Sequence, residues 1–143
     1  MDLRIRNANI KDSEAISELS GQLGYPSDRK EIKSRLSEIL DKKGHCTLVA
    51  LDRSKIVGWI HAFLSFRIES NSFVEIGGLV IDSGYQNMGI GTTLISEIQK
   101  WSQSIKCKKL RVRCNTNRTE VHGFYLNIGF EIKKEQKIFD KIL

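Results

Sequence analysis

The sequence predicts an α/β domain with a mixed, mostly antiparallel sheet of about six to seven strands and four helices. Strand-like alternation and helix-like spacing of apolar residues follow each other in the order βααβββαβαββ. Of the 143 residues, 40% are hydrophobic and only one is proline, which is typical of a folded globular domain. No internal repeat, linker or low-complexity tract is visible, so we expect residues 1–143 to form a single domain.

The first 44 residues predict one strand and two helices. Apolar and basic residues alternate over Leu3–Arg6, which indicates a strand. Asp12 is suited to cap a first helix, and Gly24-Tyr25-Pro26 should end it. A second helix is expected to begin near Ser27 and to end in the region of Gly44. The apolar stripes of the two helices are Ile16, Leu19 and Leu23, and then Ile32, Leu36, Ile39 and Leu40.

The middle of the chain predicts a hairpin and a further strand. Residues 46–51 and 56–66 have strand patterns, and the turn-forming segment 52–55 joins them. After a polar loop, residues 73–81 form the next expected strand, in which Glu75 is the only carboxylate. Simple alternation places Glu75 on the same face of that strand as Phe73, Gly77 and Leu79.

The last third predicts two helices and three short strands. A helix is expected over residues 89–103, with Ile90, Leu94, Ile98 and Trp101 facing inward. A strand over 109–114 follows, and Asn117 with Glu120 resembles a capping box at the start of a fourth helix. That helix should bury Val121, Phe124, Tyr125 and Ile128 and stop at Gly129. Residues 131–134 and 137–142 have the patterns of two final strands.

The most informative segment joins the strand 73–81 to the helix that follows it. Gln86-Asn87-Met88-Gly89-Ile90-Gly91 opens the helix, and its two glycines let a ligand approach the backbone N–H groups. A helix N-terminus with exposed N–H groups suits a phosphate or pyrophosphate. No Lys follows Gly91, which excludes a P-loop, and no third glycine follows, which excludes a dinucleotide fingerprint.

Two motifs resemble those of one enzyme family. The pattern Q-x-x-G-x-G over residues 86–91 resembles the acyl-CoA-binding motif [QR]-x-x-G-x-[GA] of the GNAT superfamily of N-acyltransferases. About 25 residues further on, residues 115–130 resemble the C-terminal signature N-x-x-R-x-x-A-H-x-F-Y-x-x-x-G-F of the same family. Val121 stands where alanine is usual. The matching positions are Asn115, Arg118, His122, Phe124, Tyr125, Gly129 and Phe130.

This resemblance implies a GNAT fold in which strands four and five splay apart around acyl-CoA. The strand before the loop would pair with the pantetheine arm, and the N–H groups of Met88 through Thr92 would hold the pyrophosphate. Gln86 would donate to a phosphate oxygen, and Asn115 would contact the cofactor or act only as a turn residue. The expected cofactor-binding residues are Leu79, Val80, Ile81, Gln86, Asn87, Met88, Gly89, Ile90, Gly91, Thr92, Asn115 and Tyr125.

The resemblance also implies catalytic residues. Tyr125 would be the general acid that protonates the leaving thiolate, although on sequence alone it could simply pack the fourth helix. Glu75 would be the base for the acceptor amine, with His61 and His122 as rivals on intrinsic pKa. We expect His122 to brace the fourth helix instead. The acceptor pocket is expected to include Tyr25, Trp59, His61 and Glu75.

The expected activity is direct transfer of an acetyl group from acetyl-CoA to a primary amine of a small molecule or a protein. The alternative is an acyl-CoA-binding sensor with little turnover. The net charge of +6 suits a polyanionic cofactor, and no stacking aromatics interleave with the basic residues as nucleic-acid binding would require.

Composition sets further expectations. No transmembrane segment or signal peptide is visible, and three cysteines without metal-ligand spacing indicate reduced thiols in the cytoplasm and no metal site. The identity of the amine is not encoded in any motif, and a homodimer is compatible with the sequence.

Overall fold

The structure is a computed structural model that describes residues 1–24 and 28–143. The expected helix break at Gly24-Tyr25-Pro26 and the helix start near Ser27 involve residues outside this described part. The chain forms two compact units, residues 1–112 and residues 113–143. In chain order the elements are β1 (Leu3–Asn7), η1 (Ile10–Asp12), α1 (Ser13–Gln22), α2 (Arg29–Leu40), β2 (His45–Asp52), β3 (Lys55–Ser65), β4 (Phe73–Ile81), η2 (Ser83–Tyr85), α3 (Ile90–Ser104), β5 (Leu110–Val112) and α4 (Thr119–Asn127).

The first unit is a five-stranded mixed sheet in the order β1-β2-β3-β4-β5. Each of the first three strand pairs is antiparallel. Only β4 and β5 run parallel, and they pair over just three residues, Val74–Ile76. The hairpin expected over residues 52–55 joins β2 to β3. The α/β class and the mostly antiparallel sheet predicted from the sequence are therefore confirmed.

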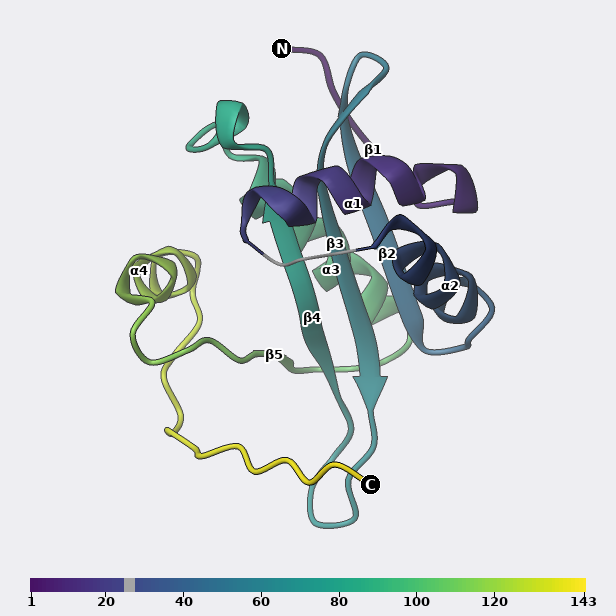
Figure 1. Cartoon of the computed structure of the whole chain (residues 1–143). Helices are drawn as coiled ribbons and strands as arrows, with labels where there is room; N and C mark the ends of the chain where they lie inside the picture. The colour runs from purple at the N-terminus through teal and green to yellow at the C-terminus, as the bar shows by residue number, and fades with distance from the viewer. Residues whose placement is uncertain (25–27) are drawn as a thin grey trace. The chain divides into compact units, whose positions relative to one another are not determined.

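Helices cover both faces of this sheet. Figure 1 shows α1 and α2 in front of the strands and α3 behind them. On the α1/α2 face, Val49 and Leu51 of β2 pack with Ile16 and Leu36. On the α3 face, Ile90, Leu94 and Ile98 are almost fully buried, as their spacing predicts. Leu23, which the sequence places on the inner stripe of α1, is instead exposed beyond the last turn of that helix.

The start of α1 differs from its prediction. Asp12 is the N-cap residue but makes no side-chain cap hydrogen bond to α1. Its buried carboxylate instead accepts hydrogen bonds from the Arg6 guanidinium at 2.8 and 2.9 Å and from the Asn9 N–H at 2.8 Å. Because a buried carboxylate needs such partners, Asp12 fixes the connection from β1 to α1.

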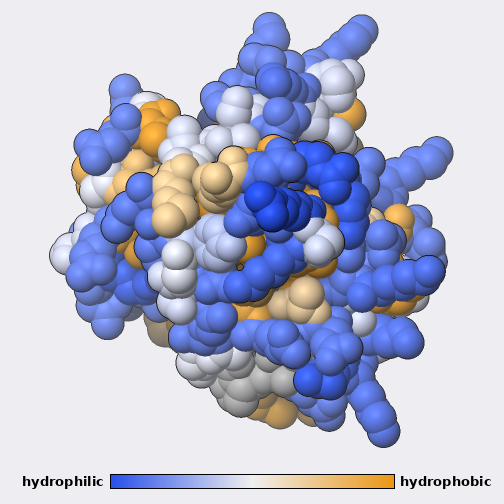
Figure 2. Space-filling model, turned by 90° about the horizontal axis from the view of Figure 1, so that it is seen from above, coloured by the Kyte–Doolittle hydropathy of each residue, from blue (hydrophilic) through white to orange (hydrophobic). Residues whose placement is uncertain are grey.

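Polar side chains dominate the surface. The face drawn in Figure 2 is mostly hydrophilic, with hydrophobic residues visible only in small patches. This distribution agrees with the burial of most large apolar side chains of the first unit in the two layers beside the sheet.

The second unit contains α4 and an extended tail. Tyr125 is buried, and its ring lies edge-on to Phe124 and Phe130 with centroids 5.0 and 5.3 Å apart. The capping box expected from Asn117 and Glu120 is wrong, because Arg118 is the N-cap residue and no side chain caps the helix.

The prediction of six to seven strands is also wrong in its count. Residues 131–143, all of which are described, form no strand, and Ile132, Ile138 and Phe139 are at least 71% exposed. An alternating pattern alone does not make a strand, because a strand also needs a hydrogen-bonding neighbour and an apolar surface to cover.

Candidate active site

One edge of β4 is open where residues 82–89 follow it, a segment that leads into the predicted phosphate-binding motif and that we call the phosphate loop. β3 pairs along the length of β4, whereas β5 pairs only with Val74–Ile76. Among the described residues, no strand pairs with Gly77–Ile81 on the β5 side. The N–H of Asp82 donates to Val57 of β3, so the backbone groups of Leu79 and Ile81 point by alternation to the open edge. This edge offers hydrogen-bonding groups to an added extended chain.

A β-bulge at Gly77 changes which β4 side chains share a face. The register jumps from His61↔Gly78 to Ala62↔Ile76, so Gly77 is an extra residue. Glu75 lies opposite Phe63 and therefore shares a face with His61 and Phe63, whereas Leu79 lies opposite Ile60 on the other face. The expectation that Glu75 and Leu79 share a face is wrong, because one inserted residue reverses the alternation.

The loop after β4 exposes a row of backbone N–H groups. Asn87 and Gly89 have φ values of 61° and 80°, and Gly89 is the N-cap residue of α3. The first N–H groups of a helix have no partner within it. In the described part of the chain, no N–H from Asn87 to Thr92 makes a hydrogen bond. The first turn of α3 thus presents unbonded N–H groups, the arrangement that suits an anion.

Side chains of this loop fasten it to the strand end. Gln86 Nε2 donates to the carbonyl of Ile81 at 2.9 Å, and the Asp82 carboxylate accepts from the Gly84 N–H at 2.9 Å. Ile90 is buried in the core, so only its backbone is available to a ligand, whereas the side chain of Met88 is 53% exposed.

The α1/α2 face of the sheet carries a histidine pair beside the bulge. His45 Nδ1 and His61 Nε2 are 2.9 Å apart, and their rings are nearly coplanar and lie next to Phe63. Burial, followed by electrostatic repulsion from His45, lowers the pKa of His61 to about 4. Burial, followed by the charge of Lys42, lowers the pKa of His45. Both rings are therefore neutral at pH 7, and one must donate to the other.

The two glycines of β4 make room for residues of β3. A Cβ on Gly77 would lie 3.0 Å from His61 Nδ1, and one on Gly78 would lie 2.7 Å from the Trp59 ring. Trp59 also packs against the cluster under α1 and α2, and its buried Nε1 donor has no hydrogen-bond partner in the described structure. The predicted acceptor residues Trp59, His61 and Glu75 therefore lie on one sheet face. Tyr25 lies outside the described residues.

In the second unit, Tyr125 is held as a buried phenol. Burial, followed by the neighbouring Cys114, raises the pKa of Tyr125 to about 12, while Arg118 opposes the shift. The ring of His122 bonds through Nε2 to the carbonyl of Asn115 at 2.8 Å, and the Arg118 N–H donates to the same carbonyl. This geometry fits the bracing role expected for His122. Asn115 is exposed, and its carbonyl closes a turn with the Arg118 N–H.

Sequence reasoning missed three contributors to this region, which are His45, the Tyr85–Asp52 hydrogen bond and Arg111 beside Glu75. Each depends on cross-strand register or on a contact between distant segments. No local motif gives that information.

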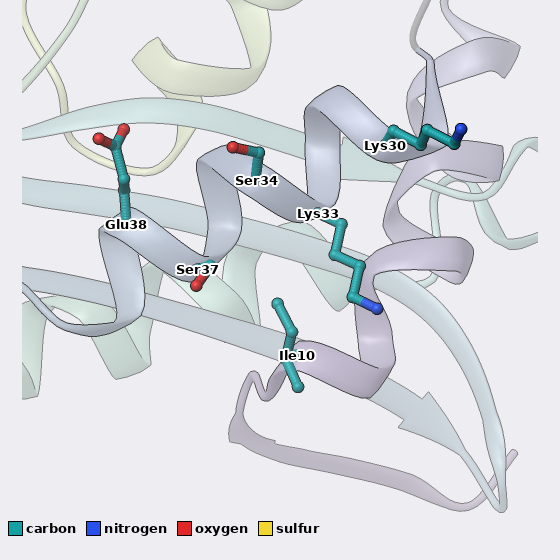
Figure 3. A pocket seen from close by; sticks show the side chains of 6 residues that line it. All are labelled: Ile10, Lys30, Lys33, Ser34, Ser37 and Glu38. Carbon is teal, nitrogen blue, oxygen red and sulfur yellow. The ribbon is translucent and has the colours of Figure 1, made fainter.

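Other features of the described residues do not belong to this site. A pocket beside α2 is lined by Ile10, Lys30, Lys33, Ser34, Ser37 and Glu38 (Figure 3). None of these is a predicted site residue. Among the described residues, no cluster of His, Cys, Asp or Glu could hold a metal ion. No described helix combines the length and the apolar composition needed to cross a bilayer.

Comparisons with known proteins agree on the family. The model of the acetyltransferase (GNAT) family matches residues 13–130. No curated protein matches the sequence.

Several solved structures share the fold. The aminoglycoside 6'-N-acetyltransferase AAC(6')-Iy, in complex with a CoA-containing bisubstrate analogue, has a TM-score of 0.88 at 18% identity over 100% of both chains. AAC(6')-IG from Acinetobacter haemolyticus has a TM-score of 0.87 at 17% identity, covering 98% of this chain and 99% of that one. Glucosamine-6-phosphate N-acetyltransferase from Arabidopsis thaliana has a TM-score of 0.83 at 23% identity, covering 98% and 100%. With the family model spanning most of its length, the chain belongs to the GNAT family of acetyltransferases.

Proposed function

We propose that this chain acts as a single N-acetyltransferase domain over residues 1–143, moving an acetyl group from acetyl-CoA directly to a primary amine. The observation that carries the proposal is the open edge of β4 that leads into the row of unbonded N–H groups at the start of α3. An extended chain of amides that ends in a pyrophosphate matches both parts in order.

Individual residues of the open edge and the loop are proposed to contact CoA. The backbone of Leu79, Val80 and Ile81 would pair with the pantetheine amides, since Leu79 and Ile81 point to the open edge. The N–H groups of Met88 through Thr92 would hold the pyrophosphate, with Asn87 shaping the loop through its positive φ. Gln86 already donates to Ile81, so it supports the loop and has its second amide hydrogen left for a phosphate oxygen. The cosubstrate supplies the activated thioester.

The chemistry needs a base and an acid. As the amine nitrogen bonds to the acyl carbon, the C–S bond breaks, the ammonium proton must leave and the thiolate must gain a proton. We assign the base to Glu75, directly or through water, and the acid to Tyr125, with Asn115 near the cofactor. Burial raises the pKa of Tyr125 to about 12, so the phenol carries its proton at neutral pH, and giving that proton to the thiolate is uphill and needs a positioned hydrogen bond. His61 stays unprotonated and is the alternative acceptor of the amine proton.

The acceptor is proposed to be an amine of a small molecule or a protein, held by Tyr25, Trp59, His61 and Glu75. The unpartnered indole N–H of Trp59 supports this, because an oxygen of a ligand would satisfy it. The names of the structural neighbours specify small-molecule amines, the aminoglycosides and glucosamine 6-phosphate. The free thiols Cys46, Cys107 and Cys114 fit a cytoplasmic protein, and the proposal allows a homodimer.

The test is release of free thiol from acetyl-CoA in the presence of a panel of primary amines, with calorimetric titration of CoA alongside. Turnover with at least one amine, together with CoA binding, supports the proposal. CoA binding without turnover would favour an acyl-CoA sensor, and absence of CoA binding would overturn the assignment of the loop.

A further inference from the structure

Three cationic side chains gather around one aromatic ring at the start of β4. Arg111, Lys109 and Arg67 have their charged groups 4.2, 5.0 and 5.5 Å from the ring centroid of Phe73. Phe73 is fully buried, whereas Arg67 and Lys109 are exposed and Arg111 is half-buried. We call Arg67, Lys109 and Arg111 the basic cluster.

The basic cluster brings three positive charges together, more than the single carboxylate of Glu75, the register partner of Arg111, can neutralise. Like charges gathered around one ring repel one another, and the cation–π contacts with Phe73 offset only part of this repulsion. An anion seated on the cluster would relieve this repulsion.

The basic cluster is not the site proposed for the CoA phosphates. Phe73 and Ile81 are the two ends of β4, so the cluster and the phosphate loop are about 25 Å apart along the strand. A pantetheine arm lying along Gly77–Ile81 would not bring a phosphate to Phe73.

The basic cluster instead borders the proposed base. Glu75 and Arg111 are register partners on neighbouring strands, which places their backbones about 5 Å apart. Phe73 precedes Glu75 by two residues, so both side chains point to one face, about 7 Å apart. Lys109 precedes Arg111 by two residues and shares its face for the same reason. If the amine of an acceptor lies at Glu75, the part of that acceptor a few bonds away from the amine therefore lies beside the positive charges of the basic cluster.

We infer that the acceptor is an anionic amine, a molecule whose primary amine lies at Glu75 and whose carboxylate or phosphate is held by Arg67, Lys109 and Arg111. This inference rests on the proposed function, because it takes Glu75 as the place where the amine reacts. A guanidinium binds a carboxylate or a phosphate through paired hydrogen bonds, which suits Arg111 and Arg67 to this task. A polycationic amine is disfavoured, because the basic cluster repels it.

The first test compares matched amines in the thiol-release assay. O-Phosphoethanolamine is set against ethanolamine, glycylglutamate against glycylglutamine, and spermidine serves as the polycation. We expect kcat/KM to be about 10- to 100-fold higher for the anionic member of at least one pair, the usual worth of a charge-assisted contact. The preference should weaken with added salt. If the preference for the anionic member occurs in the O-phosphoethanolamine pair, the acceptor carries a phosphate; if it occurs in the glycylglutamate pair, the acceptor carries a carboxylate.

The second test removes charge from the basic cluster. The double variant Arg67→Gln/Arg111→Gln should raise KM for the preferred anionic amine by about 10-fold or more, a much larger loss than the same variant shows with the neutral partner. Lys100→Gln is the matched control, since it removes a positive charge from α3 on the other face of the sheet. Arg111→Lys keeps the positive charge, so it should bind the anionic amine more tightly than the double variant does. It also shows whether the fold tolerates a change at this position.

The outcomes separate this inference from the proposed function. Turnover with equal kcat/KM for charged and neutral partners, or equal losses in the double variant and in Lys100→Gln, would overturn the inference and leave the acetyltransferase intact. If no amine is acetylated, the anion site can still be tested by calorimetric titration of O-phosphoethanolamine and glycylglutamate into the CoA-loaded protein. Binding that the double variant loses supports the anion site, and its absence in the wild-type protein overturns it.

Discussion

The phenol of Tyr85 donates a hydrogen bond of 2.8 Å to Oδ2 of Asp52, which ties the phosphate loop to the β2–β3 turn 33 residues earlier in the chain. The other oxygen of Asp52 accepts from the Asp2 N–H at 3.0 Å, and Lys55 from the same turn lies 5.3 Å from the Tyr85 ring. Gln22 of α1 reaches the same region and accepts from the Ser83 N–H at 2.9 Å. The loop is therefore held from several elements just before its N–H groups turn outward.

Tyr85→Phe should weaken cofactor binding and spare the chemistry. The substitution keeps the ring contact with Lys55 and removes only the hydrogen bond to Asp52. We expect KM for acetyl-CoA to rise several-fold with kcat nearly unchanged, and the free energy of unfolding to fall only slightly, since the hydrogen bond lies in contact with water. Steady-state kinetics and urea titration measure the two quantities. A fall in kcat at unchanged KM would contradict a role confined to the loop.

Gly89→Val should abolish tight CoA binding while the protein stays folded. Gly89 has φ of 80° and open space around its Cα, so the cost to the fold is backbone strain, about 1–2 kcal/mol, rather than a clash. A side chain there would stand between the ligand and the helix N-terminus. Gly24→Val is the control, because Gly24 has φ of 79° and equally open surroundings. Calorimetry should show at least a 10-fold loss of CoA affinity for the first variant only.

Tyr125→Phe should lower kcat by about 10²–10⁴-fold without affecting CoA affinity. The buried ring keeps its edge-on contacts with Phe124 and Phe130, and only the phenolic proton is lost. Tyr125→Phe should thus change kcat and spare cofactor binding, whereas Tyr85→Phe should change KM for acetyl-CoA and spare kcat, so each variant is a control for the other. A Tyr125→Phe enzyme with nearly normal kcat would mean that water or another group protonates the thiolate.

The histidine pair should make the fold sensitive to acid. The pKa of His61 is lowered to about 4 and that of His45 is also lowered, so the unfolded chain binds protons first as the pH falls below about 6.5. Stability should be constant above that pH and should decline toward pH 4, by at most roughly 3 kcal/mol from His61. Urea unfolding from pH 8 to 4 measures this decline. His45→Gln/His61→Gln should flatten that part of the curve, and an unchanged slope would assign the loss to other groups.

Local sequence patterns predicted the elements of the first unit well, because each depends on short-range periodicity and on glycine. The glycine motif placed the loop and the start of α3 correctly, since a positive φ at Gly89 leaves few alternatives. The two final strands failed for the opposite reason, because alternation at Ile132 and Ile138 says nothing about whether a pairing partner is present.

Side-chain neighbourhoods were harder to predict than elements. The bulge at Gly77 looks like any other glycine in a strand, yet it moves Leu79 to the face opposite Glu75. His45 and His61 are 16 residues apart, and only the β2–β3 register brings His45 Nδ1 and His61 Nε2 to 2.9 Å. Contacts of this kind follow from register, which a single sequence does not specify residue by residue.

Glu75→Gln tests the proposed base. The amide keeps the shape of the side chain and cannot take up the proton of the acceptor ammonium. We expect kcat/KM at neutral pH to fall by about 10²–10⁴-fold and to recover in part at high pH, where the free amine is abundant. Glu69→Gln, in the exposed β3–β4 loop, is the matched control and should leave the pH–rate profile unchanged.

The shape of the profile separates the candidates for the base. Because Glu75 pairs with Phe63 and therefore shares a face with His61, either could face the amine. If wild-type protein and Glu75→Gln give profiles of the same shape and similar height, Glu75 is not the base. The same measurement on His61→Gln then decides between that ring and a chain of water. If only Glu75→Gln loses activity at neutral pH and regains it when the amine is already deprotonated, the carboxylate is the group that removes the proton before attack on the thioester.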